Sequence, residues 1–277
     1  MTIYTLMPLH EALGLAVIGV DLSAPIDDET SENLSRLLAE HLVLAFPDQS
    51  LSPDQYLAAA AAFGAPMLQD RSRDPMPAYP DIGLVGRRDG QGAPNGWHTD
   101  HLHLERPPAA TLLYGVEIPP SGGRTSIANM RAAYWALPEE ERHHLETLRA
   151  VTGLDSEHAG AGVQHRPTVT HPMVCTHPIN RERAVYFHPT ETTYIEGMTR
   201  HASKDYLADL VGRMIEPEIV YHHHWVKGDV LVIDDRATWY RAQDDDDAGE
   251  NRVWWKIIVE GDRPTLLIPA SGACNVG

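Results

Sequence analysis

Apolar and polar positions follow two different periods along this chain. Short apolar runs rich in β-branched residues and bounded by Gly, Pro or Asp recur, a pattern typical of buried strands. Between them, apolar residues repeat every three or four positions, which predicts amphipathic helices. Strands are expected at 15–22, 41–47, 81–86, 110–119, 184–189, 229–235 and 253–261. Helices are expected at 28–41, 53–63, 129–149 with an interruption at Pro138, and 203–215.

The order of these elements favours a fold built mainly of β-strands. In the C-terminal half, turns separate the strands and helices do not alternate with them, which argues against a doubly wound parallel sheet. We therefore predict a jelly-roll core with helices packed on its outside. No repeat, linker or compositional break divides the sequence, so we expect one domain over 1–277. The acidic run at 244–249 is expected to be a solvated loop.

Composition narrows the classes of function. A chain of 277 residues with 43% hydrophobic and 22% charged residues can bury a substantial core. Its net charge of −17 argues against binding to nucleic acid or to an anionic membrane surface. No apolar run has the length of a membrane span, and the first residues lack the pattern of a secretory signal, so we expect a cytoplasmic protein. The two cysteines, Cys175 and Cys274, indicate neither a disulfide framework nor a zinc–thiolate site.

The stretch NGWHTDHLHLERPP at 95–108 carries the most distinctive chemistry. In an extended segment side chains alternate, so His98 and Asp100 share one side while Thr99 and His101 face the other. One imidazole and one carboxylate are two of the three ligands of a site that holds Fe(II) on one face and leaves the opposite positions open. The same spacing also occurs at His103 and His144. The position of His98, after GAPNGW and before a strand, is typical of a pocket rim.

The sequence around this stretch resembles that of a known protein family. The segments WHTDHLHLERPPAATLLYGVEIPPSGGRTSIANMRAAYWALPEE, GDVLVIDDRATWYRAQDD and NRVWWKIIVEGDRP resemble the TauD/TfdA family of Fe(II)- and 2-oxoglutarate-dependent dioxygenases. The resemblance spans nearly the whole chain. It implies a double-stranded β-helix, which agrees with the jelly roll expected from strand spacing. It also implies Fe(II), 2-oxoglutarate and O2 as cofactors, a small-molecule substrate, and a homo-oligomeric state, a dimer or a tetramer.

Two positions depart from the family pattern. The family normally carries His-Arg-Ala where this chain has Tyr240, Arg241 and Ala242, so the expected third metal ligand is replaced. A phenolate ligand favours Fe(III) over Fe(II), so a simple exchange with unchanged chemistry is not expected. The resemblance assigns 2-oxoglutarate to a site that includes Thr125 and Arg252, and the position that grips its distal carboxylate is Lys256 in place of arginine. Lysine keeps the charge but loses the bidentate fork.

Three further residues are candidates for the same pocket. His188 stands where the family usually has asparagine, and we hypothesise that it supplies the missing imidazole directly or through water. The alternative for His188 is a hydrogen-bonded residue of the pocket or a substrate contact. Asn95 and Tyr194 flank regions that shape the substrate cavity in relatives and are candidate substrate contacts. Relatives commonly carry arginine at the position of Tyr194, which weakens the case for a sulfonate or a simple carboxylate as substrate.

Three functional hypotheses remain open from the sequence. The first is an iron oxygenase that uses 2-oxoglutarate and O2 to hydroxylate or otherwise oxidise a small molecule, and the retained His98, Asp100, Thr125 and Arg252 favour it. The second keeps iron and oxygen but no longer uses 2-oxoglutarate. The third is a noncatalytic relative that binds a small molecule or a partner, a hypothesis that Tyr240 and Lys256 favour.

Overall fold

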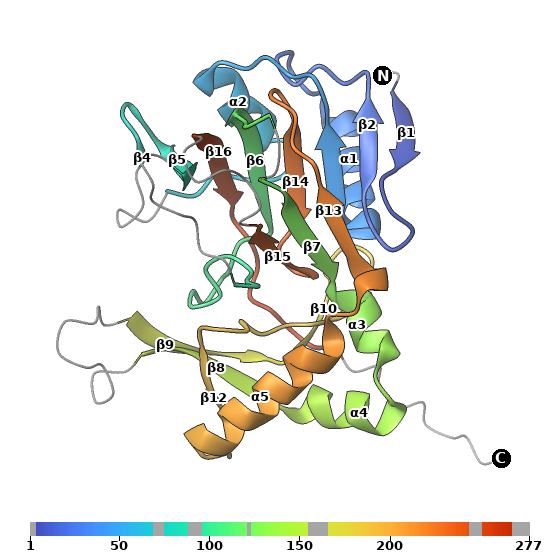
Figure 1. The fold of residues 1–277 in the computed structure, drawn as a ribbon, viewed down its shortest axis with the longest axis vertical. Coiled ribbons are helices and arrows are strands. Elements are labelled where there is room, and N and C mark those ends of the chain that lie inside the picture. Colours follow the sequence, from blue (N-terminus) through green and yellow to red (C-terminus); the bar gives the residue numbers. More distant parts are fainter. Residues whose placement is uncertain are drawn as a thin grey trace.

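A computed structural model describes residues 4–68, 75–87, 96–120, 123–154, 166–243 and 251–267. Its largest element is a mixed sheet of eight strands, which runs in the order β1-β2-β3-β14-β6-β16-β5-β4. Strands from both ends of the sequence meet in it, since β14 lies between β3 and β6 (Figure 1). The bounds of its strands are β1 Thr5–Pro8, β2 Leu15–Ile18, β3 Val43–Phe46, β4 Pro75–Met76, β5 Tyr79–Arg87, β6 Ala110–Glu117, β14 Val230–Asp234 and β16 Arg252–Val259.

A second, antiparallel sheet faces this one. It has the order β13-β7-β15, with β7 Thr125–Asn129, β13 Val220–His223 and β15 Thr238–Ala242. The interior between the two sheets is filled by side chains from both, among them Ile127, Leu231, Trp239 and Trp254. Two facing sheets with a shared apolar interior form the jelly roll that the sequence predicts. Polar side chains that point into this interior therefore lie in a site screened from water.

Two helices cover the outer face of the eight-stranded sheet (Figure 1). Helix α1, Asp28–His41, begins where the Asp27 side chain accepts a hydrogen bond from the Thr30 amide. Helix α2, Pro53–Ala60, begins with a capping box between Ser52 and Gln55. Their buried residues pack with the outward side chains of the central strands. This second apolar layer holds the sheet in place behind the site.

The rest of the described chain forms a layer below the two sheets. Helices α3 (Met130–Ala136), α4 (Glu139–Thr147) and α5 (Arg200–Met214) lie beside the sheet β12-β8-β9, as Figure 1 shows. The strands of this layer are β8 Arg149–Leu154, β9 Arg166–Pro172, β12 Thr192–Ile195 and the hairpin β10 Val174–Thr176 with β11 Arg183–Val185. No helix in the described ranges is long and apolar enough to cross a bilayer.

Candidate active site

The loop that carries His98 is attached to β15 by the main chain. The His98 amide donates to the Tyr240 carbonyl over 3.0 Å, and the Tyr240 amide donates to the His98 carbonyl over 2.8 Å. Thr99 projects the other way, where its hydroxyl donates to the Asp235 carbonyl over 3.0 Å. Beyond His98 the chain leaves the extended conformation and forms a turn at 100–103, so the alternation expected from the sequence does not continue through this segment. The bridge brings His98 and Asp100 against the residue that replaces the family's third ligand.

The hydrogen bond of the His98 ring fixes its tautomer. Nδ1 lies 2.9 Å from the Gly96 carbonyl oxygen, which can only accept, so Nδ1 carries the proton. The lone pair is then on Nε2. Metal-binding histidines usually donate their second ring N–H to a carbonyl or carboxylate in this way. His98 therefore has the protonation pattern of a metal ligand, and its ring lies 4.6 Å from that of Tyr240.

Asp100 is the most heavily contacted residue of the site. Its side chain is 1% exposed. Its Oδ2 accepts hydrogen bonds from the Thr111 hydroxyl over 2.8 Å and from the Tyr240 phenol over 2.5 Å. The same oxygen forms an ion pair with the ammonium of Lys256, whose side chain is 4% exposed. The carboxylate predicted to bind metal is thus paired here with a lysine from β16.

A second buried carboxyl, that of Asp235, extends this network. Its Oδ2 also lies 2.8 Å from the Thr111 hydroxyl oxygen, which has only one proton to donate. Burial and the neighbouring Asp100 raise the pKa of Asp235 well above its usual value. The raised pKa favours the protonated form of Asp235, and a protonated Asp235 can donate to Thr111 while Thr111 donates to Asp100. With Asp235 neutral, the charges of Asp100 and Lys256 balance inside the site.

Tyr240 remains a neutral donor at physiological pH. Burial, followed by the nearby charge of Asp100, raises the pKa of its phenol well above 10. A phenol held protonated in this way is a hydrogen-bond donor and not an anionic ligand. In the described part of the chain, no three His, Cys, Asp or Glu side chains gather closely enough to hold a metal ion. The Tyr240 ring lies beside the two predicted ligands, His98 and Asp100.

His188 lies on the far side of His98, with 6.4 Å between their ring centroids. Its Nδ1 accepts hydrogen bonds from the amides of Thr190 and Glu191, over 3.2 and 3.0 Å. A neutral imidazole whose Nδ1 accepts must carry its proton on Nε2. Burial lowers the pKa of His188 to about 4, so it is neutral near pH 7. This tautomer suits donation to a bound molecule, and it is the wrong one for direct coordination through Nε2.

Thr125 and Arg252 lie at another end of the interior. Thr125 on β7 accepts a hydrogen bond from Trp225 Nε1 over 2.9 Å, so its own hydroxyl proton remains available to a bound acceptor. The guanidinium of Arg252, which is 2% exposed, donates to the Gln243 carbonyl over 2.8 Å. The main chain joins these positions, because the Gln243 amide donates to the Arg124 carbonyl over 2.7 Å. Thr125 and Arg252 therefore belong to one corner of the pocket.

Gly123 leaves room for the side chain of Arg252. Its φ is +69°, and a Cβ at this position would lie 2.9 Å from Arg252 Cδ. Both observations call for glycine.

The remaining predicted residues are less closely tied to the site. Asn95 lies outside the described residues. Tyr194 is half-buried on β12, where the guanidinium of Arg200 lies 5.0 Å from its ring centroid. Its role as a substrate contact stays a prediction. Lys256, predicted to hold 2-oxoglutarate, instead contacts Asp100 in this structure, so that role would require its ammonium to move.

Sequence reasoning missed three residues of this network: Thr111, Asp235 and Trp225. A signal existed for Asp235, because the run LVIDD ends an apolar strand with two acids, and a buried acid needs a partner. Nothing in the sequence distinguishes Thr111 from other threonines in strands.

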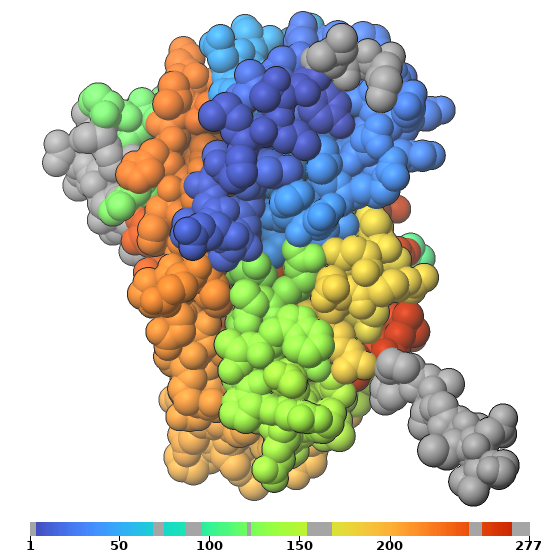
Figure 2. Space-filling view, turned by 90° about the vertical axis from the view of Figure 1, so that its right-hand side faces the viewer, coloured from blue at the N-terminus to red at the C-terminus, as the bar shows by residue number. Residues whose placement is uncertain are grey.

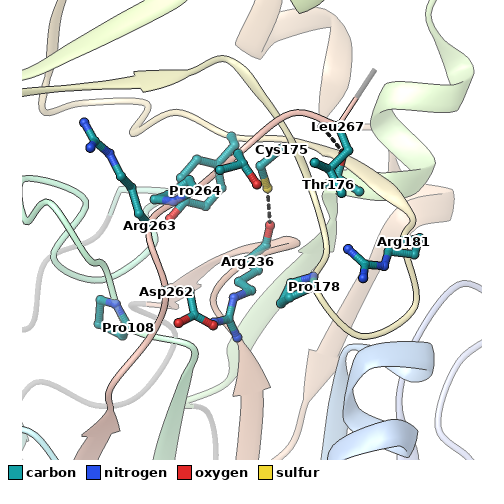
Figure 3. Close-up of a pocket in the computed structure, with 12 residues that line it drawn as sticks. Pro108, Cys175, Thr176, Pro178, Arg181, Arg236, Asp262, Arg263, Pro264 and Leu267 are labelled. Atoms are coloured by element: carbon teal, nitrogen blue, oxygen red, sulfur yellow. Dashed lines mark hydrogen bonds and ion pairs between the residues drawn. The ribbon is translucent and has the colours of Figure 1, made fainter. Parts of the chain in front are cut away.

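A separate cavity of about 100 Å³ lies on the side of the molecule where β10 and the segment 262–267 meet (Figure 3). Arg181, Arg236 and Arg263 line it, and Asp262 lies 3.5 Å from Arg236. Its buried Cys175 thiol donates to the Arg236 carbonyl. None of the predicted site residues lines this cavity.

Comparison with known proteins places this arrangement in a family. The model described as "Taurine catabolism dioxygenase TauD, TfdA family" matches residues 5–257. Pentalenolactone F synthase of Streptomyces avermitilis is 31% identical, over 91% of this chain and 92% of the relative. The alpha-ketoglutarate-dependent 2,4-dichlorophenoxyacetate dioxygenase of Cupriavidus pinatubonensis is also 31% identical, over 85% of this chain and 91% of the relative.

Solved structures agree with the sequence relatives. A taurine dioxygenase from Burkholderia xenovorans superposes with a TM-score of 0.83 at 30% identity, covering 95% of this chain and 92% of that one. AAD-2, solved in complex with Mn(II) and N-oxalylglycine, gives a TM-score of 0.81 at 26% identity, with 95% and 100% coverage. These matches confirm the predicted family resemblance and the predicted jelly-roll fold.

Proposed function

Because the chain belongs to the TauD/TfdA family of dioxygenases, we propose that it is a non-haem Fe(II) oxygenase that uses 2-oxoglutarate and O2 to oxidise a small molecule. The main-chain bridge between His98 and Tyr240 carries this proposal, because it assembles the family's metal-binding positions around one point. Relatives named as alpha-ketoglutarate-dependent dioxygenases, which act on small molecules, support the same reaction class.

The donor set fits a divalent cation held by two protein ligands. His98 presents the Nε2 lone pair, and Asp100 presents a carboxylate whose orientation is fixed by Thr111 and Tyr240. Further positions would be filled by the cosubstrate and by water. When bound, iron with 2-oxoglutarate supplies the activation of dioxygen. The neutral phenol of Tyr240 would remain a hydrogen-bond donor to Asp100 when the cation is held.

The corner formed by Thr125 and Arg252 suits the distal carboxylate of 2-oxoglutarate. The Thr125 hydroxyl donates while Trp225 holds its oxygen, and the Arg252 guanidinium supplies a fixed positive charge. Trp225 and Trp254, whose ring centroids are 5.4 Å apart, exclude water from this corner. Lys256 remains a proposed third contact.

The substrate would meet His188, with Asn95 and Tyr194 as proposed further contacts. The His188 ring lies 6.4 Å from that of His98 and carries its proton on Nε2, so it would donate to an acceptor atom of a substrate bound there. Since His188 is neutral, it adds no charge to substrate recognition.

An anaerobic titration of the metal-free protein with Fe(II) and then 2-oxoglutarate tests this function. We expect one iron per chain and a weak visible charge-transfer band when the cosubstrate chelates the metal. Admission of O2 should then convert 2-oxoglutarate to succinate. Iron binding without the band would replace the proposal with an oxygenase that does not use 2-oxoglutarate, and the absence of iron binding would leave a noncatalytic binding protein.

We also propose a homo-oligomer, a dimer or a tetramer. Support comes from β1, an edge strand of the eight-stranded sheet on which Leu6 and Met7 are 39% and 56% exposed. Figure 2 looks onto this N-terminal hairpin. Light scattering coupled to gel filtration would measure the mass, and a monomer would contradict the proposal.

One domain over 1–277 and a cytoplasmic location stay proposals as well. The first is supported by the eight-stranded sheet, in which β1 and β16 both take part. The second is supported by the requirement of Fe(II) for a reducing compartment.

A further inference from the structure

The closest charge to Asp100 in this site comes from the protein itself. Lys256 Nζ contacts Asp100 Oδ2, and both side chains are almost completely buried. The same carboxylate is the one that a divalent cation requires. The site thus already contains a cation at the position where the proposed function needs a metal.

The strand that carries Lys256 explains this contact. Arg252, Trp254 and Lys256 alternate along β16, so all three point into the interior between the sheets. Lys256 Nζ lies 5.9 Å from the centroid of the Tyr240 ring, which keeps it near the phenol that also donates to Asp100. Tyr240 and Lys256, the two departures from the family pattern, therefore act on the same carboxylate.

The negative charge of Asp100 is compensated by groups of the protein itself, without a metal ion. A buried carboxylate is costly unless a cation or hydrogen bonds compensate its charge, and here Lys256, Thr111 and Tyr240 all do so. A metal ion that binds Asp100 brings two positive charges next to an ammonium whose side chain is only 4% exposed. Repulsion at such short range in a poorly screened interior opposes occupancy by both cations.

We propose that Lys256 is an internal counter-cation that competes with the metal for Asp100, so that metal binding requires its ammonium to leave this carboxylate. The inference rests on the proposed function, since it concerns the same metal site. It gives Lys256 a role in metal binding in addition to its proposed contact with 2-oxoglutarate. Lys256 is a positioning residue that lowers the affinity of the site for metal alone.

A dianionic cosubstrate would reduce this penalty. Bound 2-oxoglutarate carries two negative charges, which offset those of the metal and give the displaced ammonium a new anion nearby. Metal and dianion should therefore bind more tightly together than either does alone, a coupling that is reciprocal by thermodynamic linkage.

The experiment measures Mn(II) binding to the metal-free full-length protein by electron paramagnetic resonance, in the absence of cosubstrate and of O2 turnover. Lys256→Gln removes the charge while its amide can still donate to Asp100, and Lys256→Met removes both. Lys256→Arg keeps the charge. Lys204→Met, in the exposed face of α5, removes the same charge far from the site and serves as the matched control.

We expect Lys256→Gln to bind Mn(II) about 10- to 100-fold more tightly than the wild type, the range typical of changes to groups around a metal ligand. Lys256→Arg and Lys204→Met should bind like the wild type. If Lys256→Met is unstable without metal, Mn(II) should raise its melting temperature more than that of the wild type, which gives the same answer by a second measurement.

Three results would overturn the inference, and only the second would also reject the proposed function. Equal Mn(II) affinity of wild type and Lys256→Gln would reject Lys256 as a competitor, while the metal site itself would stand. No specific Mn(II) binding by either protein would reject both the competitor and the iron oxygenase. Weaker binding of N-oxalylglycine to the manganese-loaded Lys256→Gln protein, with unchanged affinity for Mn(II) alone, would assign Lys256 to the cosubstrate.

Discussion

The phenol of Tyr240 donates to the carboxylate of Asp100 over 2.5 Å, at a position where the family pattern has a histidine. This contact turns a ligand position into a hydrogen-bond donor for the neighbouring ligand. Tyr240→His should restore an imidazole beside His98 and Asp100, and we expect its affinity for Mn(II) to rise about tenfold or more because a third protein donor is gained. Tyr240→Phe, which restores no donor, is the control. Equal metal affinity of Tyr240→His and Tyr240→Phe would contradict the assignment of this position.

Buried His188 should make stability depend on pH. Its pKa is about 4 in the folded protein, whereas an exposed histidine titrates near 6.5. Between these values the unfolded chain binds a proton that the folded chain excludes, so the free energy of unfolding decreases as pH falls. From about pH 7 to about pH 5 we expect His188 to account for a loss of about 2 kcal/mol. Urea denaturation of the wild type and of His188→Asn at the two pH values measures this loss. If the free energy of unfolding fell equally with pH in both proteins, His188 would not be its source.

Asp235 should tolerate an amide better than an apolar side chain. Because the acid is neutral and donates to Thr111, Asp235→Asn can donate in its place and should change the free energy of unfolding by less than about 1 kcal/mol. Asp235→Ala removes the donor and should cost about 1–3 kcal/mol. Chemical denaturation checks both, and a larger loss for asparagine than for alanine would show that Asp235 is ionised.

The corner with Thr125 should control affinity for the cosubstrate and not for the metal. Thr125→Val keeps the shape and removes the hydroxyl, and we expect 2-oxoglutarate to bind about tenfold more weakly, the equivalent of one hydrogen bond to a charged group. Gly123→Ala should also weaken it, because the new Cβ would crowd Arg252. Calorimetry with the manganese-loaded protein measures the affinity for 2-oxoglutarate. The affinity of each variant for Mn(II) alone should remain at the wild-type value.

Cys175 should be inert while the protein is folded. Burial raises the pKa of its thiol to about 12, so almost no thiolate is present at neutral pH. In a Cys274→Ser variant, which leaves Cys175 as the sole cysteine, we expect no reaction with a thiol reagent until denaturant is added. Rapid modification of the native protein would contradict this environment.

Much of the fold follows from the sequence because its signals are local. The apolar run at 229–235 became β14, the helical period at 28–41 became α1 with the same bounds, and Pro138 separates α3 from α4 as expected. Strands β8 and β9 were not predicted, because their residues mix polar and apolar types without the alternation that marks a half-buried strand.

The site was predictable only where its residues are close in sequence. His98 and Asp100 could be paired because alternation in one short segment decides which way each side chain points. The partner of Asp100 could not be found in this way, since the reach of Lys256 depends on how β16 lies against a distant loop. The charge of Lys256 suggested that it binds the cosubstrate anion. In the structure its ammonium instead contacts the carboxylate of Asp100.

The strand order of the eight-stranded sheet also determines when each strand can pair with its neighbours during synthesis. β3 and β6 are made early, yet the strand between them is β14, and β6 gains its other neighbour only when β16 emerges. Until then both strands have open edges that can pair wrongly or recruit a chaperone. Asp100 is synthesised long before Tyr240 and Lys256, the residues that hold it. The candidate site is thus completed late in synthesis, because a chain that ends before β16 lacks both Arg252 and Lys256.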